Sequence, residues 1–232
     1  MSKLHPWLRT VLSLVLYVTV YYLLFRDIRS IALLVLVIVL HELGHYIAMR
    51  SYGYSNVKML FIPMLGAFVS GSPIRVDPGK KLVVLFAGPL PGIVLGMIFA
   101  MIYSRTQQHI YYQLALMFIF LNVFNLIPLT PMDGGQIVQT LFNKGGRWIQ
   151  TGFILISSVV IIYWMVKRGN YFLGFLLLLL TSRLLQIWKR KPDMAEKETE
   201  PTMELSWNEK TIFLSIWLAA IIVPLQTLYR II

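Results

Sequence analysis

The sequence alternates between long apolar segments and short polar ones along most of its length. A helix that crosses a bilayer needs about 20 mainly apolar residues. A seventh apolar segment, at 211–229, contains Pro224, so a surface-lying or broken helix is an alternative there. The pattern therefore predicts an all-α polytopic membrane protein with six core transmembrane helices and a seventh C-terminal hydrophobic helix. The six core segments are residues 7–25, 31–49, 82–103, 110–129, 148–166 and 171–188.

Two segments depart from this alternation. Residues 51–81 are about as long as a span, but proline and glycine interrupt them, and their centre is too apolar for an ordinary loop. Irregular backbone is tolerated at membrane depth only against protein or a wet cavity, so we expect a re-entrant loop or short β-strands there. Residues 191–210 are polar and charged, which favours a flexible cytoplasmic linker. This linker would separate a membrane-embedded core at 1–190 from a C-terminal hydrophobic segment at 211–232.

The composition agrees with a membrane location, because 57% of the 232 residues are hydrophobic and only 13% are charged. A soluble domain of this length needs more charge to cover its surface, so we expect an integral protein of the cell membrane, surrounded by lipid. The chain has no cysteine, which excludes disulfides, thiolate metal ligands and a cysteine nucleophile. The net charge of +11 does not indicate a nucleic-acid partner, because the basic residues lie in short clusters between apolar segments.

The distribution of Lys and Arg predicts the orientation in the membrane, because cytoplasmic loops carry an excess of both. Most of the 21 basic residues fall on the side of the N-terminus, and Arg183 lies within a span. We therefore expect a cytoplasmic N-terminus. The C-terminus is then outside if the seventh segment spans the membrane, and inside if it does not. The smaller group, on the other side, is Arg26, Arg29, Arg105, Lys167, Arg168 and Arg230.

The second apolar segment ends with three polar side chains, in the sequence His41-Glu42-Leu43-Gly44-His45. Positions i and i+4 share a face of a helix, so two imidazoles can bind one metal ion, and the glutamate can take a proton from metal-bound water. The alternative is a pair of structural histidines bonded to neighbouring helices. That alternative leaves the glutamate unexplained, because an acid at the centre of a span costs about 2.5–3.5 kcal/mol on an insertion scale. The pattern favours a metal site with Glu42 as its base.

A catalytic zinc site usually takes a third protein ligand and keeps its fourth position for water. The other histidines, His5 and His109, are not placed to complete a site at the cytoplasmic end of the second span, which leaves carboxylates. Asp133 follows a span that runs in the same direction as the histidine helix, so both reach the same depth near the cytoplasmic face. The alternative is that Asp133 is a turn residue before Gly134. The shared depth favours Asp133 as the third ligand.

In three places the sequence resembles the site-2 proteases, a family of intramembrane zinc metalloproteases. HELGH, at 41–45, resembles the H-E-x-x-H motif of that family, and NLIPLTPMDGG, at 125–135, resembles its N-x-x-P-x-P-x-x-D-G motif. FAGPLPG, at 86–92, resembles the A-G-P segment found there, although Gly92 stands where the family often has asparagine. The close resemblance covers residues 31–141, and we expect a minimal member without a PDZ or CBS domain.

The resemblance implies that His41, His45 and Asp133 bind one zinc ion and that Glu42 is the catalytic acid and base. The implied activity is that of an endopeptidase that hydrolyses peptide bonds in or near the transmembrane segments of membrane proteins. Its partners would be those substrates and the lipid bilayer, and neither the substrate nor the oligomeric state follows from the motifs.

Further roles follow from the resemblance alone. Asn125, at the start of the second motif, would position the substrate or the oxyanion. The re-entrant segment of the family corresponds to residues 51–81 of this chain. In that segment Gly66, Ala67 and Phe68 are candidates for a strand edge that pairs with an unwound substrate.

Two other functions compete with proteolysis. A metal transporter or storage protein could use the same ligands, but it would need further acids or histidines along a path. The first, third, fifth and sixth spans contain none. A protease-like scaffold could bind membrane partners without cutting them, but it would have no physical need to keep Glu42 beside the metal ligands.

Overall fold

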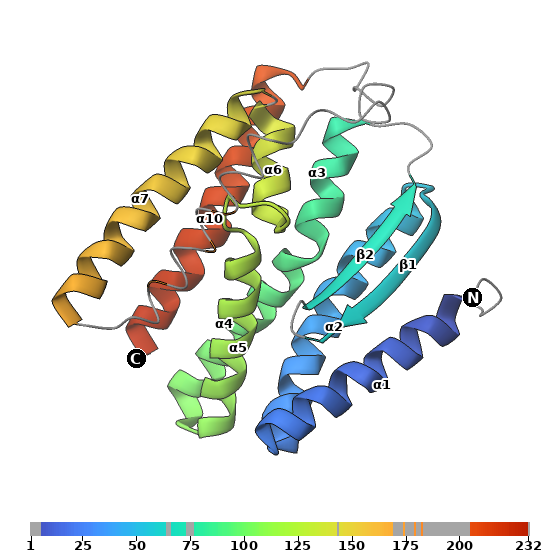
Figure 1. The fold of residues 1–232 in the computed structure, drawn as a ribbon, viewed down its shortest axis with the longest axis vertical. Helices are drawn as coiled ribbons and strands as arrows, with labels where there is room; N and C mark the ends of the chain where they lie inside the picture. Colours follow the sequence, from blue (N-terminus) through green and yellow to red (C-terminus); the bar gives the residue numbers. More distant parts are fainter. Residues whose placement is uncertain are drawn as a thin grey trace.

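The computed structural model describes residues 6–63, 66–72, 77–142, 144–168 and 205–231, with the isolated residues 174, 179 and 182. The span expected at 171–188 and most of the linker expected at 191–210 lie outside these ranges. The described part is mostly helical, with one two-stranded sheet after the second helix (Figure 1). Both features agree with the fold class that the sequence predicts. The helices are α1 (Pro6–Phe25), α2 (Ile28–Ser51), α3 (Pro78–Ala87), α4 (Pro89–Thr106), α5 (His109–Asn125), α6 (Asp133–Phe142), α7 (Lys144–Arg168) and α10 (Trp207–Ile231).

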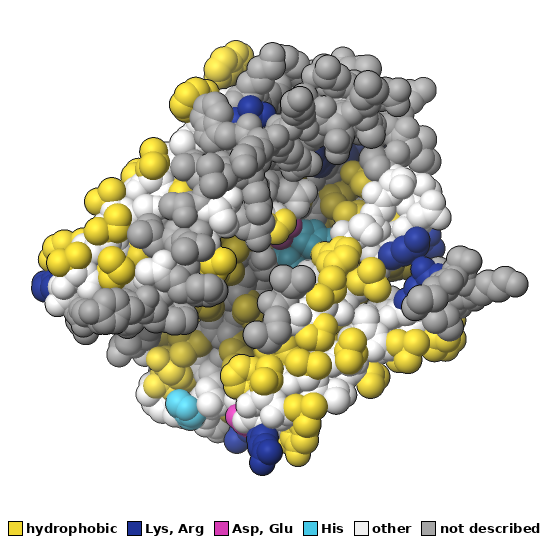
Figure 2. Space-filling model, in the orientation of Figure 1, with side chains coloured by type: hydrophobic (Ala, Val, Ile, Leu, Met, Phe, Trp, Pro, Cys, Tyr) yellow, Lys and Arg dark blue, Asp and Glu magenta, His cyan; other side chains and the backbone are white. Residues whose placement is uncertain are grey.

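Within the described ranges, five helical stretches are long and apolar enough to cross a membrane. Their outer faces are apolar: on α7, for example, Ile156 and Val159 are 69% and 68% exposed. Exposed apolar side chains also gather over much of the face shown in Figure 2. Lipid rather than water is the solvent that suits such a surface, so the chain is an integral membrane protein. The five stretches are Trp7–Phe25, Ile28–Ser51, Pro78–Thr106, Gly145–Lys167 and Trp207–Ile231.

Three helices differ in extent from the sequence prediction. The third expected span begins earlier and consists of α3 and α4, which meet at Gly88 before Pro89. The fourth, expected at 110–129, ends at Asn125 as α5, because Pro128 lacks the N–H that would continue the helix. The last one runs without a break through Pro224 as α10.

The segment after α2 contains a β-hairpin of β1 (Ser55–Ile62) and β2 (Gly66–Ser72), which lies beside α1 and α2 (Figure 1). Helix α1 covers the outer edge of β1, where the Thr10 hydroxyl donates to the Met59 carbonyl over 2.7 Å. The Phe61 N–H donates to the Ser13 hydroxyl over 3.2 Å at the same edge. The backbone groups of β1 at these two positions therefore point toward α1 and away from β2.

The register of the hairpin determines which backbone groups of β2 point away from β1. Met59 pairs with Val69, and Phe61 pairs with Ala67, in antiparallel register. In such a ladder, directly opposite residues either exchange both hydrogen bonds or point both backbone groups outward. Because Met59 and Phe61 point outward on β1, Ala67 and Val69 direct their N–H and C=O groups to the far edge of β2.

The buried core lies between α3, α4, α6 and α10, in the middle of the molecule (Figure 1). Helix α10, expected only as an extra C-terminal segment, contributes Trp217 and Ala220 to it. This packing places the start of α6 against the helices that carry the remaining site residues. The core residues are Leu82, Leu85, Phe86, Ile93, Leu126, Ile137, Val138, Leu141, Leu205, Trp217 and Ala220.

Candidate metal centre

Helix α2 brings three polar side chains into the interior, where His41, Glu42 and His45 are each only 6% exposed. Two glycines allow the close approach of neighbouring backbone. A Cβ atom on Gly44 would meet the carbonyl oxygen of Ala87, and one on Gly88 would meet the His45 ring. Gly44 of HELGH and Gly88 of FAGPLPG therefore form one contact, at which α2 packs directly on the junction of α3 and α4.

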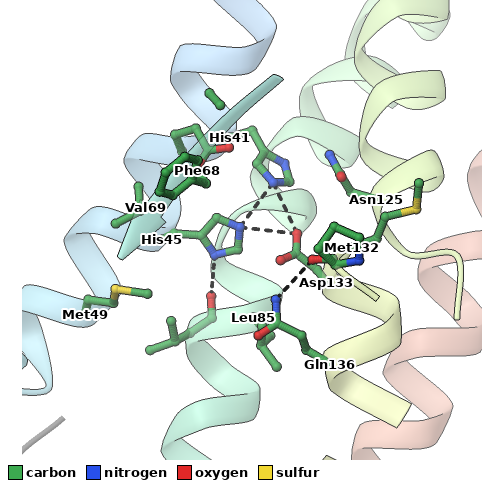
Figure 3. Close-up of a pocket in the computed structure, with 14 residues that line it drawn as sticks. His41, His45, Met49, Phe68, Val69, Leu85, Asn125, Met132, Asp133 and Gln136 are labelled. Carbon is green, nitrogen blue, oxygen red and sulfur yellow. Dashed lines mark hydrogen bonds and ion pairs between the residues drawn. The ribbon is translucent and has the colours of Figure 1, made fainter. Parts of the chain in front are cut away.

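The two histidines and Asp133 converge on one point (Figure 3). The Nε2 atoms of His41 and His45 lie 3.1 Å apart. Each of them lies 3.2 Å from Oδ2 of Asp133. Residues distant in the sequence thus bring three potential ligand atoms together, as the shared depth of their spans predicted.

The other ring nitrogen of each histidine, Nδ1, also has a hydrogen-bond partner. Nδ1 of His45 lies 2.8 Å from the carbonyl oxygen of Val84, and Nδ1 of His41 lies 2.8 Å from Oδ1 of Asn122. A backbone carbonyl can only accept, so Nδ1 of His45 carries the proton and its Nε2 presents a lone pair. A metal-binding histidine is ordinarily held in this way, with the second nitrogen bonded to a carbonyl or carboxylate.

The spacing of these atoms fits a tetrahedral zinc ion. Zinc binds imidazole nitrogen at about 2.0–2.1 Å and carboxylate oxygen at about 2.0–2.2 Å, which places neighbouring ligands roughly 3.3 Å apart. The three observed separations of 3.1, 3.2 and 3.2 Å are close to this edge length. Two imidazole nitrogens and a carboxylate oxygen directed at one point are a donor set that suits a metal cation. The residues present therefore fit a zinc ion.

The turn after α5 delivers Asp133 to the cluster. The chain leaves α5 at Asn125, folds back through its prolines and starts α6 at Asp133. A Cβ atom on Gly134 would meet the Leu126 carbonyl, and one on Gly135 would meet the backbone at Leu129. Only glycine lets the start of α6 pack so tightly under the turn, which explains the Asp-Gly-Gly sequence.

The cluster opens into a cavity of about 150 Å³. Glu42 lines it next to the two histidines and Asp133, and Asn125 lines it from the end of α5. Ala67 and Phe68 line it from β2, while Gly66 forms the start of that strand, opposite Ile62. Figure 3 shows Phe68 and Val69 on the α2 side and Asn125 and Met132 on the other. In Figure 2 histidine side chains lie at the bottom of a central hollow.

Sequence reasoning missed three contributors to the site. Val84 bonds His45 through its backbone, which no side-chain pattern reveals. Val69 lines the cavity beside the two β2 residues that were expected. Asn122 did carry a signal, because it is an amide within an apolar span, about one helical turn before Asn125.

Comparisons with known proteins find relatives of this chain. A zinc metalloprotease of Methanocaldococcus jannaschii is 32% identical over 117 residues, which are 48% of this chain and 34% of the relative. Stage IV sporulation protein FB of Bacillus subtilis is 31% identical over 130 residues, covering 53% of this chain and 43% of the relative. The chain thus matches less than half the length of these two relatives.

Among solved structures, the site-2 protease from Methanocaldococcus jannaschii aligns with a TM-score of 0.49 and 22% identity. The alignment covers 84% of this chain and 89% of that one. The family profile of Peptidase family M50 matches residues 29–108 and 104–166, which include α2 with its three polar residues, α5 and Asp133. The chain therefore belongs to Peptidase family M50, the site-2 protease family that its motifs resemble.

Proposed function

We propose that this chain is a zinc-dependent intramembrane endopeptidase that hydrolyses peptide bonds in or near transmembrane segments of membrane proteins. One observation carries the proposal: a three-atom ligand cluster of zinc dimensions shares a cavity with a buried glutamate, inside a bundle with an apolar outer surface. Family membership and a relative described as a zinc metalloprotease support it.

The proposed mechanism assigns one role to each polar group of the cavity. Zinc held by the cluster would supply a Lewis acid that polarises a peptide carbonyl and acidifies water. Glu42 takes the proton from the attacking water and passes it to the leaving amine. The Asn125 amide, which lines the same cavity, donates to the oxygen that becomes negative in the transition state.

Strand β2 gives the substrate a place to bind. A peptide bond within a helix is shielded by its own hydrogen bonds, so the substrate must unwind before it is cut. The outward backbone groups of Ala67 can pair with the extended segment and offset part of that loss, while the Val69 N–H bonds the Glu42 carboxylate. The register refines the expected edge of Gly66, Ala67 and Phe68, because Phe68 directs its backbone toward β1 and contributes its side chain to the cavity.

We place the site near the cytoplasmic face, where water reaches it from that side. The basis is the excess of Lys and Arg on the N-terminal side of the membrane, together with the position of His45 in the last third of α2. Attaching cysteine-reactive probes to single cysteines at the two ends of α2 would test this orientation, since the chain has no cysteine of its own.

The decisive experiment is Glu42→Gln, which removes the base and keeps the shape of the side chain. We expect this variant to accumulate, bind one zinc per chain and cleave nothing. The readouts are the zinc content of the purified protein and the membrane-protein fragments in cells that carry each form. Glu209→Gln, an exposed glutamate at the start of α10, is the matched control and should cleave as the wild type does.

The outcomes separate the competing functions. Cleavage by Glu42→Gln at the wild-type rate would remove Glu42 from the mechanism and overturn the proposal. Zinc binding without any fragment specific to the wild type would favour a scaffold. Zinc movement across vesicles that contain the protein would favour a transporter. The described residues contain one cluster suited to a metal ion, formed by His41, His45 and Asp133, and this argues against a transport path there.

A further inference from the structure

Asn122 occupies an unusual position for an amide. It lies in the middle of the apolar helix α5 and is 1% exposed, so its polar atoms would be costly without partners. Both have one. Its Nδ2 donates to the Phe118 carbonyl over 2.7 Å, and its Oδ1 lies 2.8 Å from Nδ1 of His41.

These two bonds fix the orientation of the amide. The Phe118 carbonyl can only accept, so the atom that faces it must be the amide nitrogen. The amide oxygen then faces His41, and because it too can only accept, Nδ1 of His41 must carry the proton. Nε2 of His41 is left with a lone pair that points toward Asp133 and His45 (Figure 3). Asn122 thus selects the tautomer of His41 that can bind a metal.

Gly92 on α4 determines whether Asn122 can hold this position. A Cβ atom on Gly92 would meet the amide nitrogen, the amide carbon and the amide oxygen of Asn122. The obstacle is therefore the whole amide group, which cannot turn aside without breaking its bond to His41 or to Phe118. Glycine at 92 leaves the space in which the amide of Asn122 sits.

We infer that Asn122 is a positioning residue of the metal centre and that Gly92 is its steric partner. Together the two residues set how tightly His41 binds zinc. This inference rests on the proposed zinc function and names the residues that tune it. The equivalent bond to His45 comes from the Val84 backbone. A side-chain substitution can therefore remove the hydrogen-bond partner of His41, but not that of His45.

Zinc affinity, measured by chelator competition on the purified full-length chain, tests the inference. Asn122→Ala should weaken zinc binding about 10–100-fold, the usual effect of losing a partner behind a metal ligand. Asn122→Leu keeps the approximate volume of the side chain but has no acceptor for the His41 Nδ1–H, so it should weaken zinc binding as Asn122→Ala does. A purely packing role would predict that Asn122→Leu binds zinc nearly as tightly as the wild type.

Gly92→Ala should weaken zinc binding as much as Asn122→Ala, because its new methyl group displaces the amide. The double variant should be no weaker than either single one, since the alanine at 122 frees the space. Gly96→Ala is the matched control on the same helix. Its Cβ would meet Ile119 and Phe118 rather than Asn122, so it should lower thermal stability and leave zinc affinity unchanged.

The results distinguish two failures. If the wild type binds no zinc, or Glu42→Gln still cleaves, the proposed function fails. If the wild type binds zinc and Glu42→Gln is silent, but Asn122→Ala and Gly92→Ala bind zinc as tightly as the wild type, this inference alone fails. Additive losses in the double variant would also overturn it, because the two residues would then act independently.

Discussion

The indole N–H of Trp217 donates a hydrogen bond to the backbone carbonyl of Leu126 over 2.9 Å, and both groups are buried. Leu126 is the first residue after α5 and begins the turn that carries Asp133 to the metal centre. Its carbonyl also lies where a side chain on Gly134 would be. Helix α10 therefore holds the turn that supplies the third candidate ligand, so the C-terminal segment is part of the support of the candidate site.

Trp217→Phe should destabilise the protein, because the Leu126 carbonyl would be left buried without this donor. The expected cost is about 1–3 kcal/mol, which lowers Tm by roughly 2–4 °C for each kcal/mol in a chain of this size. Thermal unfolding in detergent measures it. Trp207→Phe on the same helix is the control, because Trp207 is 84% exposed. An equal change in both variants would mean that the hydrogen bond does not stabilise the turn.

Asp27 gives the protein a pH-dependent helix cap. Hydrogen bonds from Ser30, and a further one from the backbone of Arg29, hold the pKa of the Asp27 carboxyl below its usual value of 3.8. A lowered pKa in the folded state means that the ionised cap stabilises the protein above the usual value, and that this stabilisation is lost as the pH falls through the folded pKa.

Asp27→Asn keeps an amide oxygen that can accept the same hydrogen bonds but cannot titrate. The wild type should therefore lose more stability than Asp27→Asn between about pH 5 and pH 2, while losses from the other carboxyl groups are common to both. Unfolding curves at several pH values measure the difference. Curves that stay parallel across this range would contradict the role of the ionised cap.

The membrane fold could be predicted because each span must be apolar over a length set by the bilayer. The exact ends could not. The break between α3 and α4 depends on how α2 packs against Gly88, and the end of α5 depends on the turn that follows it. The hairpin was expected only as one of two possibilities, because proline and glycine in an apolar segment fit a re-entrant loop equally well.

The candidate site likewise has residues that the sequence predicts and residues that only the packing reveals. His41 and His45 follow from the period of one helix, and Asp133 follows from the depth at which two parallel spans end. Asn122 lies 81 residues from His41, and only the packing of α2 against α5 brings them together. The sequence marks Asn122 as unusual but does not say which side chain it meets. Backbone partners such as Val84 leave no mark in the side-chain pattern at all.

Gly44→Ala should disable the site without changing a ligand. The added methyl group would meet the Ala87 carbonyl, so α2 would have to move away from the junction of α3 and α4. His41 and His45 move with the helix, and a misplacement of about 1 Å can lower activity about 100-fold.

Zinc content and cleavage rate both measure the effect. Gly152→Ala on α7 makes the same chemical change where no neighbouring atom of the described residues lies within 4 Å, and it should bind zinc and cleave normally. Wild-type zinc binding and cleavage in Gly44→Ala would show that the two helices tolerate a wider separation than the structure has.

Ala67→Pro tests the edge of β2 as the substrate-binding strand. Proline removes the Ala67 N–H, which points to the far edge of β2 rather than into the ladder, so the hairpin should keep its pairing with β1. The Val69 N–H is unsuited to this test, because it bonds the Glu42 carboxylate. The substrate would lose one backbone hydrogen bond, worth about 0.5–1.5 kcal/mol, so kcat/KM should fall by up to about tenfold. Zinc content should not change, because no metal ligand is touched.

Ala67→Val is the control for this change, since it alters the side chain and keeps the N–H. The comparison uses reconstituted protein and a membrane-protein substrate identified from fragments that are absent with Glu42→Gln. A fall in kcat/KM with Ala67→Pro but not with Ala67→Val supports pairing of the backbone with the substrate. Equal rates in the two variants would move substrate binding elsewhere in the cavity, with the wall formed by Asn125 and Met132 as the next surface to test.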